Sequence, residues 1–324
     1  MSRREPAPFY ETPLGRAFLG DSLEVLSSFA DGSVNLIVTS PPYALHFKKE
    51  YGNVEQGRYV QWFLPFGRQF HRLLKEDGSL VIDIGGAWVP GRPTRSLYHF
   101  ELLIALCREV GFHLAQELYW YNPAKLPSPA EWVNVRKLRV KDAVECLWWL
   151  SKAPWPKANN QNVLQEYSPD MQRLLERGYR AKERPSGHRI TRKFKDNGGS
   201  IPPNVIICGN NDANGHYLSR CNAEKKKPHP ARFPPAVPLF FIRFLTDKGD
   251  LVLDPFAGSN TTGQVCEAEG RRWVAVERDR EYLETSRYRF EPREVPPGEG
   301  KKPRGRRGGK KASSNGAGQK EFFR

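Results

Sequence analysis

Short apolar runs bounded by turn residues recur along the chain, and stretches with helical periodicity separate them. Most of the runs are rich in valine, leucine and isoleucine and are too short for helices, which is typical of buried parallel strands. We expect strands at residues 34–39, 80–84, 113–121, 143–150, 251–254 and 273–277, with a weaker one at 17–19. We expect helices at residues 22–29, 58–74, 97–110, 235–246, 261–270 and 280–289. This alternation predicts an α/β fold with helices on both faces of the sheet.

The alternation breaks between residues 155 and 232, where proline, glycine, asparagine and charged residues dominate. The end of the chain is rich in glycine, proline, lysine and arginine and has little apolar surface to bury. We therefore predict one folded domain made of residues 1–154 and 229–290. Residues 155–228 would form an inserted region, and residues 291–324 a disordered basic tail.

The positive charge of the chain is concentrated in the two segments that break the pattern. Lysine and arginine total 51 against 36 acidic residues, a net charge of +15. Residues 155–232 carry +8 of this excess and residues 291–324 carry +6. Such an excess favours a polyanionic partner, with nucleic acid the first candidate, although a basic but otherwise ordinary enzyme has the same composition.

Cysteine spacing and hydropathy exclude further classes of protein. None of the five cysteines belongs to a CxxC pair, so we expect no zinc site and no other metal. No apolar run reaches the roughly 18 residues of a membrane span. The first residues also lack the apolar core of a signal peptide. We therefore expect a cytoplasmic protein with reduced thiols and no membrane partner.

Residues 254–263 (DPFAGSNTTG) follow the expected strand at 251–254 and lead into a helix. Small residues there let a ligand approach the backbone closely, and the start of a helix offers free N–H groups. The motif is neither a Walker loop nor GxGxxG, but open α/β sheets bind ligands at this end of their strands. Glu277 ends the next strand, where an acid commonly binds ribose hydroxyls. An ordinary strand–turn–helix with a capping serine or threonine has the same pattern.

A second motif, Ser40, Pro41, Pro42 and Tyr43, comes directly after the expected strand at 34–39. Two adjacent prolines prevent the chain from continuing as a regular helix or a central strand. They fix a rigid loop at the carboxyl edge of the sheet. A hydroxyl and an aromatic ring on such a loop suit a planar ligand, but a plain proline turn after a strand has the same sequence.

Together, the two motifs resemble those of the amino-group DNA methyltransferases that use S-adenosyl-L-methionine. Within these enzymes, the chain resembles the beta-group N4-cytosine-specific enzymes of bacterial type II restriction–modification systems, in which SPPY precedes the glycine-containing motif. Further matches are FLGDSL at 18–23, DGSL at 77–80, WYNP at 120–123 and HPARFP at 229–234. The resemblance covers residues 14–290. It implies a Rossmann-like methyltransferase fold with a mixed sheet, circularly permuted and with an inserted target-recognition region.

The resemblance implies methyl transfer to the exocyclic N4 of a cytosine flipped out of double-stranded DNA. The Ser40 hydroxyl and the Pro41 carbonyl would accept hydrogen bonds from N4, Pro42 would keep the loop rigid, and Tyr43 would stack on the base. The methyl group would protect DNA from a cognate restriction endonuclease, a functional rather than physical partner. N6-adenine methylation remains an alternative, although those enzymes usually carry Asp or Asn in place of Ser40. A DNA-binding module without catalysis is a second alternative.

The resemblance also implies which residues contact the cofactor and the DNA. The cofactor-binding residues would be Asp21, Phe233, Asp254, Phe256, Gly258, Ser259, Asn260, Thr261 and Glu277. Glu277 would bind the ribose and Asp21 the adenine amino group, and His229, Pro230 and Phe233 would line the methionyl side. Residues 155–228 take the place of the family's target-recognition region, and arginine is the commonest reader of guanine. The DNA-binding candidates in this region are Arg184, His188, Arg189, Arg192 and Lys193.

Overall fold

The computed structural model describes residues 5–44, 54–177, 196–210 and 215–292. These residues contain one sheet with the strand order β1-β2-β9-β8-β3-β4-β6-β5-β7. The strands are β1 Tyr10–Glu11, β2 Gly15–Leu19, β3 Val34–Thr39, β4 Leu74–Ile84, β5 His113–Tyr121, β6 Val144–Ser151, β7 Val205–Ile207, β8 Leu251–Asp254 and β9 Arg272–Glu277. The helices are α1 Ser22–Leu26, α2 Tyr59–Leu73, α3 Tyr98–Ala105, α4 Pro169–Arg177, α5 His216–Ala223, α6 Ala236–Leu245, α7 Thr261–Glu269 and α8 Arg280–Ser286.

Strands from opposite ends of the chain meet in the sheet. The strands β2, β9, β8, β3 and β4 run parallel, and β6 is antiparallel to both β4 and β5. Strands β8 and β9 come last in the chain, yet they lie between β2 and β3. The predicted mixed α/β sheet is confirmed, and its order agrees with the circular permutation that the order of the two motifs implies.

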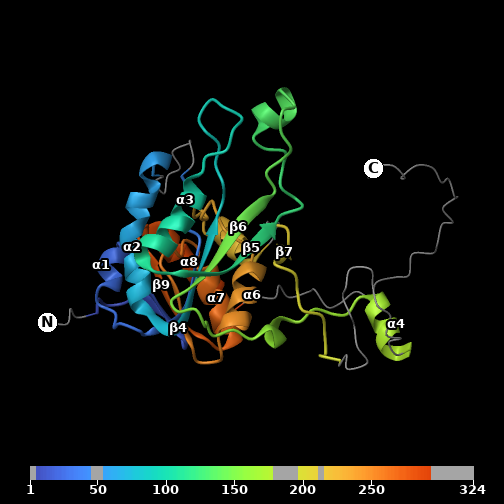
Figure 1. The fold of residues 1–324 in the computed structure, drawn as a ribbon. Coiled ribbons are helices and arrows are strands. Elements are labelled where there is room, and N and C mark those ends of the chain that lie inside the picture. The colour runs from blue at the N-terminus through green and yellow to red at the C-terminus, as the bar shows by residue number, and fades with distance from the viewer. Residues whose placement is uncertain (1–4, 45–53, 178–195, 211–214, 293–324) are drawn as a thin grey trace. The chain divides into compact units, whose positions relative to one another are not determined.

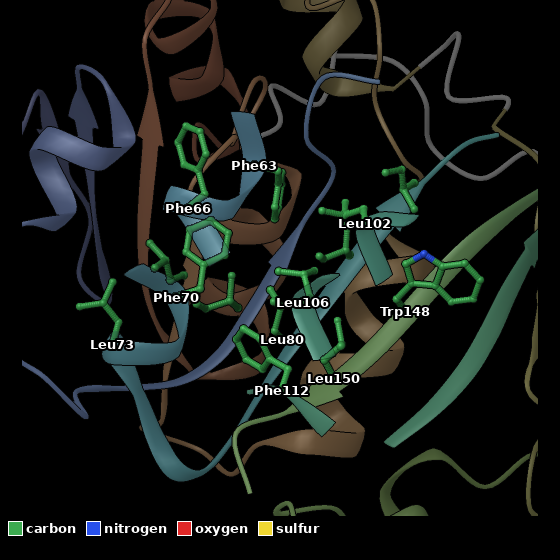
Figure 2. Packing of buried hydrophobic residues seen from close by; sticks show 14 of the residues in the cluster. Phe63, Phe66, Phe70, Leu73, Leu80, Leu102, Leu106, Phe112, Trp148 and Leu150 are labelled. Carbon is green, nitrogen blue, oxygen red and sulfur yellow. The ribbon is translucent and has the colours of Figure 1, made fainter. Parts of the chain in front are cut away.

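Helices cover both faces of the sheet (Figure 1). Successive side chains of a strand point to opposite faces, so each strand contributes to two hydrophobic clusters. On one face Leu80 of β4 packs in a cluster with Phe63 and Phe70 of α2, as Figure 2 shows. On the other face Val81 belongs to the cluster that contains Phe241 of α6. Burial on both faces explains why the central strands have continuous apolar sequences.

Several predicted boundaries differ from those in the structure. We predicted a helix to residue 74 and a strand from residue 80, but α2 ends at Leu73 and β4 begins at Leu74. Leu74 pairs with Val34 of β3 and Ser79 with Leu36, and the register shift between these pairs leaves the polar residues 75–78 as an irregularity within the strand. The predicted helix 97–110 ends as a regular helix at Ala105 and continues as a π-helical turn over Leu106–Val110.

The described part of the predicted insertion includes a strand and a helix that pack on the sheet's own elements. Strand β7 pairs with the end of β5. The hydroxyl groups of Tyr217 in α5 and Thr285 in α8 are hydrogen-bonded at 3.2 Å. These contacts do not test the predicted boundaries of the insertion at residues 155 and 228, which stay a prediction. The candidates from Arg184 to Lys193, and the tail from residue 293, lie outside the described residues.

All five cysteines are free thiols. Burial raises the pKa of each of them, that of Cys146 to about 11, so they stay protonated at neutral pH. Across the described ranges, we find no group of three or more His, Cys, Asp or Glu residues that could hold a metal ion. Within the same ranges, no helix has both the length and the apolar character needed to cross a membrane.

Candidate active site

A cavity of about 570 Å³ lies where five strands of the sheet end. Its lining includes one residue at or just after the carboxyl end of each of the parallel strands β2, β3, β4, β8 and β9. These residues are Asp21, Ser40, Asp83, Pro255 and Glu277. The two motifs, which are more than 200 residues apart in the chain, therefore face the same cavity.

The cavity brings together most of the predicted site residues. Those in its lining are Asp21, Ser40, Pro41, Pro42, Tyr43, Phe233, Phe256, Gly258, Ser259, Thr261 and Glu277. His229 and Pro230 line it as well. Asp254 and Asn260 are not part of the lining, because both are buried and hydrogen-bonded to neighbouring elements.

Asp254 is buried and does not line the cavity, but its hydrogen bonds connect the two motifs. Its carboxylate accepts hydrogen bonds from Thr39 Oγ1 at 2.8 Å and from Thr262 Oγ1 at 2.7 Å. Burial raises the pKa of Asp254 to about 6, although these bonds oppose the shift. Thr39 immediately precedes Ser40, and Thr262 lies in the first turn of α7. Asp254 thereby fixes the position of the SPPY loop relative to the start of that helix.

Asn260 shapes the glycine-containing loop in another way. Its backbone has a φ of 56°, and its side chain caps α7 by accepting a hydrogen bond from Gly263 N at 3.0 Å. Gly258 has a φ of +51°, and a Cβ there would lie 2.9 Å from the His229 ring. The loop therefore requires glycine at this position for both its backbone conformation and its close approach to His229. Burial lowers the pKa of His229 to about 4, so the ring is neutral at pH 7.

Glu277 holds the same loop from β9. One carboxylate oxygen accepts a hydrogen bond from Gly258 N at 2.8 Å, and the other accepts from Asp279 N at 2.9 Å. A carboxylate offers about four acceptor positions, so it has capacity for ligand hydroxyls beside these two bonds. Burial raises the pKa of Glu277, while the backbone N–H groups oppose the rise.

The SPPY loop is connected to residues that the sequence did not reveal. The Ser40 hydroxyl donates to Tyr43 Oη at 3.3 Å, and Tyr43 donates to Glu145 Oε2 at 2.7 Å. Lys125 donates to the other Glu145 oxygen at 2.9 Å. Within the same loop, the Pro42 carbonyl accepts a hydrogen bond from the Tyr59 hydroxyl at 2.8 Å. Three of the four SPPY residues are thus held by hydrogen bonds.

Asp83 is a second carboxylate in the cavity that we did not predict. Only 3% of its surface is exposed, and within the described residues its Oδ1 has no hydrogen-bond partner. Burial and the neighbouring Glu145 raise its pKa well above the ordinary value. The sequence does carry a signal, because Asp83 interrupts the apolar run 80–84 that forms a buried strand.

An aromatic wall forms another part of the lining. The Phe256 ring lies 5.1 Å from the Phe66 ring and 6.1 Å from the Trp62 ring, measured between centroids, and all three side chains line the cavity. Phe66 and Trp62 come from α2, whose sequence pattern predicts a helix but does not indicate that its aromatic residues line a cavity. This wall suits a flat, apolar ligand group.

Comparisons with known proteins show the family of the chain. A family model described as DNA methylase matches residues 34–287. The type II methyltransferase M.PvuII of Proteus hauseri is 54% identical over 287 residues, 87% of this chain and 85% of the relative. The type II methyltransferase M.BglII of Bacillus subtilis is 26% identical over 86% of this chain and 69% of the relative. A solved structure of the cytosine-N4-specific PvuII DNA methyltransferase is 47% identical, covers 89% of this chain and 90% of that one, and has a TM-score of 0.73. The chain therefore belongs to the DNA methylase family.

Proposed function

We propose that this DNA methylase transfers a methyl group from S-adenosyl-L-methionine to N4 of a cytosine in double-stranded DNA. The observation that carries the proposal is that the SPPY loop and the loop held by Glu277 line one cavity. The cytosine-N4 specificity named for the PvuII enzyme supports the choice of base. The type II name of M.PvuII supports a role in protecting bacterial DNA, in the cytoplasm, from a cognate restriction endonuclease.

The residues of the cavity fit S-adenosyl-L-methionine. Glu277 has acceptor capacity for the ribose hydroxyls, and Gly258, whose N–H it holds, lies in the cavity lining. The wall around Phe256 offers a flat apolar surface for the adenine, and Asp21 at the cavity edge offers an acceptor for its amino group. Asp254 and Asn260 would hold the loop rather than touch the cofactor. When bound, the cofactor supplies an electrophilic methyl group on a sulfonium.

The residues around Ser40 are suited to hold and orient a cytosine amine. The N4 lone pair is delocalised into the ring, so the amine is a weak nucleophile and its orientation decides the rate. The Ser40 hydroxyl donates towards Tyr43, which leaves its lone pairs free to accept an N4–H bond. The Pro41 carbonyl would accept the other N4–H bond. These bonds favour a pyramidal nitrogen. Its lone pair is then no longer delocalised into the ring and can point at the methyl group.

After methyl transfer, N4 must lose one proton. Oδ1 of Asp83 is the acceptor we propose, because it is buried, lines the cavity and has no partner in the described residues. Because the pKa of Asp83 is raised, its ionised form is a stronger base than an exposed aspartate. For the Ser40 hydroxyl to pass the proton from N4, its single O–H would turn from Tyr43 Oη to Asp83 while its oxygen accepts from N4.

The expected product is N4-methylcytosine. Purified protein would be incubated with isotopically labelled S-adenosyl-L-methionine and unmethylated genomic DNA, and the nucleosides would be separated by mass spectrometry. The methylated positions would then be mapped to give the target sequence. The DNA adenine methyltransferase YhdJ of Escherichia coli is 25% identical to this chain, so N6-methyladenine is the specific product that would contradict the proposal. A reaction with no labelled nucleoside would favour a non-catalytic DNA-binding role.

Replacing Tyr43 by phenylalanine should lower kcat by about tenfold, the effect of roughly 1.4 kcal/mol. The substitution keeps the ring but removes the hydroxyl that links Ser40 to Glu145. Calorimetry should show unchanged cofactor affinity, since Tyr43 lies on the base side. Tyr119→Phe, on β5 outside the cavity lining, is the matched control and should keep wild-type kcat. Equal rates in the two variants would show that the link to Glu145 does not position the loop.

A further inference from the structure

Residues 122–143 join β5 to β6 and extend beyond the ends of these strands; we call them the arm (Figure 1). Both ends of the arm belong to the wall of the cavity. The residues of the arm in the lining are Asn122, Ala124, Lys125, Ser128 and Asp142. DNA that delivers a base to this cavity must therefore pass close to the arm.

Hydrogen bonds fix the base of the arm. Asn122 N donates to the Ala143 carbonyl at 2.8 Å, which closes the arm like a hairpin. The Lys141 ammonium donates to the carbonyl oxygens of Pro123 at 3.3 Å and Lys125 at 3.1 Å. The backbone segments on the two sides of the arm are thus joined by one lysine side chain.

Asp142 adds a connection to the loop that follows β4. Its carboxylate pairs with Arg95 of that loop at 2.9 Å and with Arg139 of the arm at 3.0 Å. Its backbone N–H donates to the Ser128 carbonyl at 3.0 Å. Side chains on this part of the arm are therefore held in place relative to the cavity.

Two large apolar side chains project from this fixed region into solvent. Leu126 is 80% exposed and directly follows Lys125, which lines the cavity. Val140 is 85% exposed and directly precedes Lys141, which binds the Lys125 carbonyl. Single exposed apolar residues are common, but these two lie on neighbouring backbone segments at the edge of a substrate cavity. We call Leu126 and Val140 the rim pair.

The charge of the arm suits a DNA backbone. Residues 122–143 contain five basic and two acidic residues, a net charge of +3. Lys137 is exposed, and the structure gives it no salt bridge within the described residues. Basic side chains that contact phosphates position a protein on the duplex without reading its sequence.

We propose that the rim pair enters the duplex at the target site and fills the space that the extruded base leaves. This inference rests on the proposed function, in which the target cytosine leaves the stack. Extrusion exposes the faces of the neighbouring base pairs to water, and apolar side chains inserted between base steps can cover such faces. Leu126 and Val140 offer exposed apolar surface within two residues of Lys125 and Asp142, which line the cavity that receives the base.

The test compares Leu126→Ala and Val140→Ala with two matched controls on the full chain. Leu97→Ala changes a leucine that is 59% exposed next to α3, and Val135→Ala changes a valine of the arm that is 68% exposed; neither residue lines the cavity. The substrate is a duplex with the mapped target site and 2-aminopurine beside the target base, whose fluorescence rises when stacking is lost. A second duplex carries a mispaired base opposite the target, which weakens the stack beforehand.

The variants of the rim pair should methylate the paired duplex about tenfold more slowly in single turnovers and show a smaller fluorescence rise. On the mispaired duplex they should remain within about threefold of the wild type, because less extrusion energy is needed. Equal losses on both duplexes, or rates that match those of Leu97→Ala and Val135→Ala, would overturn the role of the rim pair. A wild-type protein that methylates the duplex without any fluorescence rise would instead overturn base extrusion, and the rim pair with it.

Discussion

Replacing Ser40 by alanine should lower kcat by on the order of 10²-fold or more, the usual effect of removing a transition-state hydrogen bond in a closed site. The hydroxyl lies in the cavity on a loop that two prolines, Asp254 and Tyr59 hold in position. Its loss removes one of the two acceptors proposed for N4 and interrupts the proton path to Asp83. The small side chain should not disturb the fold.

Single-turnover assays with saturating DNA and cofactor would measure this effect. The affinities for both ligands should hardly change, because Ser40 acts on the transition state rather than on binding. Ser33→Ala is a matched control, since Ser33 is a half-buried serine whose hydroxyl donates to the Ala30 carbonyl outside the cavity. If Ser40→Ala keeps more than about half of the wild-type kcat, the acceptor role fails.

Local patterns were enough to predict the strands that position the site. The apolar runs at 34–39 and 251–254 became β3 and β8 without a change of bounds, because both are buried on two faces. The two motifs were visible because their residues are contiguous in the chain. Proline and glycine restrict or release the backbone locally, so their effect can be predicted without knowing the fold.

Contacts between distant segments could not be predicted in this way. Glu145 lies 102 residues after Tyr43, and the pairing of β6 with β4 brings it to the SPPY loop, where Lys125 bonds to it. The resemblance implies a cofactor contact for Asp254; in the structure this residue lies outside the cavity lining, and its hydrogen bonds connect Thr39 to Thr262. Sequence identified a chemically important carboxylate there, but its partners are set by the sheet order.

Replacing Glu277 by alanine should weaken cofactor affinity by about 10- to 100-fold, from the loss of charge-assisted hydrogen bonds worth roughly 1.5–3 kcal/mol. The proposed ribose contact is lost, and so is the bond that holds Gly258 N at 2.8 Å. Calorimetry with S-adenosyl-L-methionine would measure this change. Glu281→Ala, which removes an exposed glutamate of α8 outside the cavity lining, is the matched control and should bind the cofactor normally.

The pH dependence of cofactor binding gives a sharper test of the same contact. Burial, together with the charge of Asp279, raises the pKa of Glu277, so its carboxylate becomes protonated at a higher pH than an exposed glutamate would. Because the ionised form is the better acceptor for hydroxyls, wild-type affinity should fall as the pH is lowered through this raised pKa. Asp254 and His229 are unchanged in Glu277→Ala, so any pH effect of theirs remains in the variant. The difference between the two affinity profiles should therefore shrink towards acid pH, and a constant difference at every pH would mean that Glu277 does not bind the cofactor as a carboxylate.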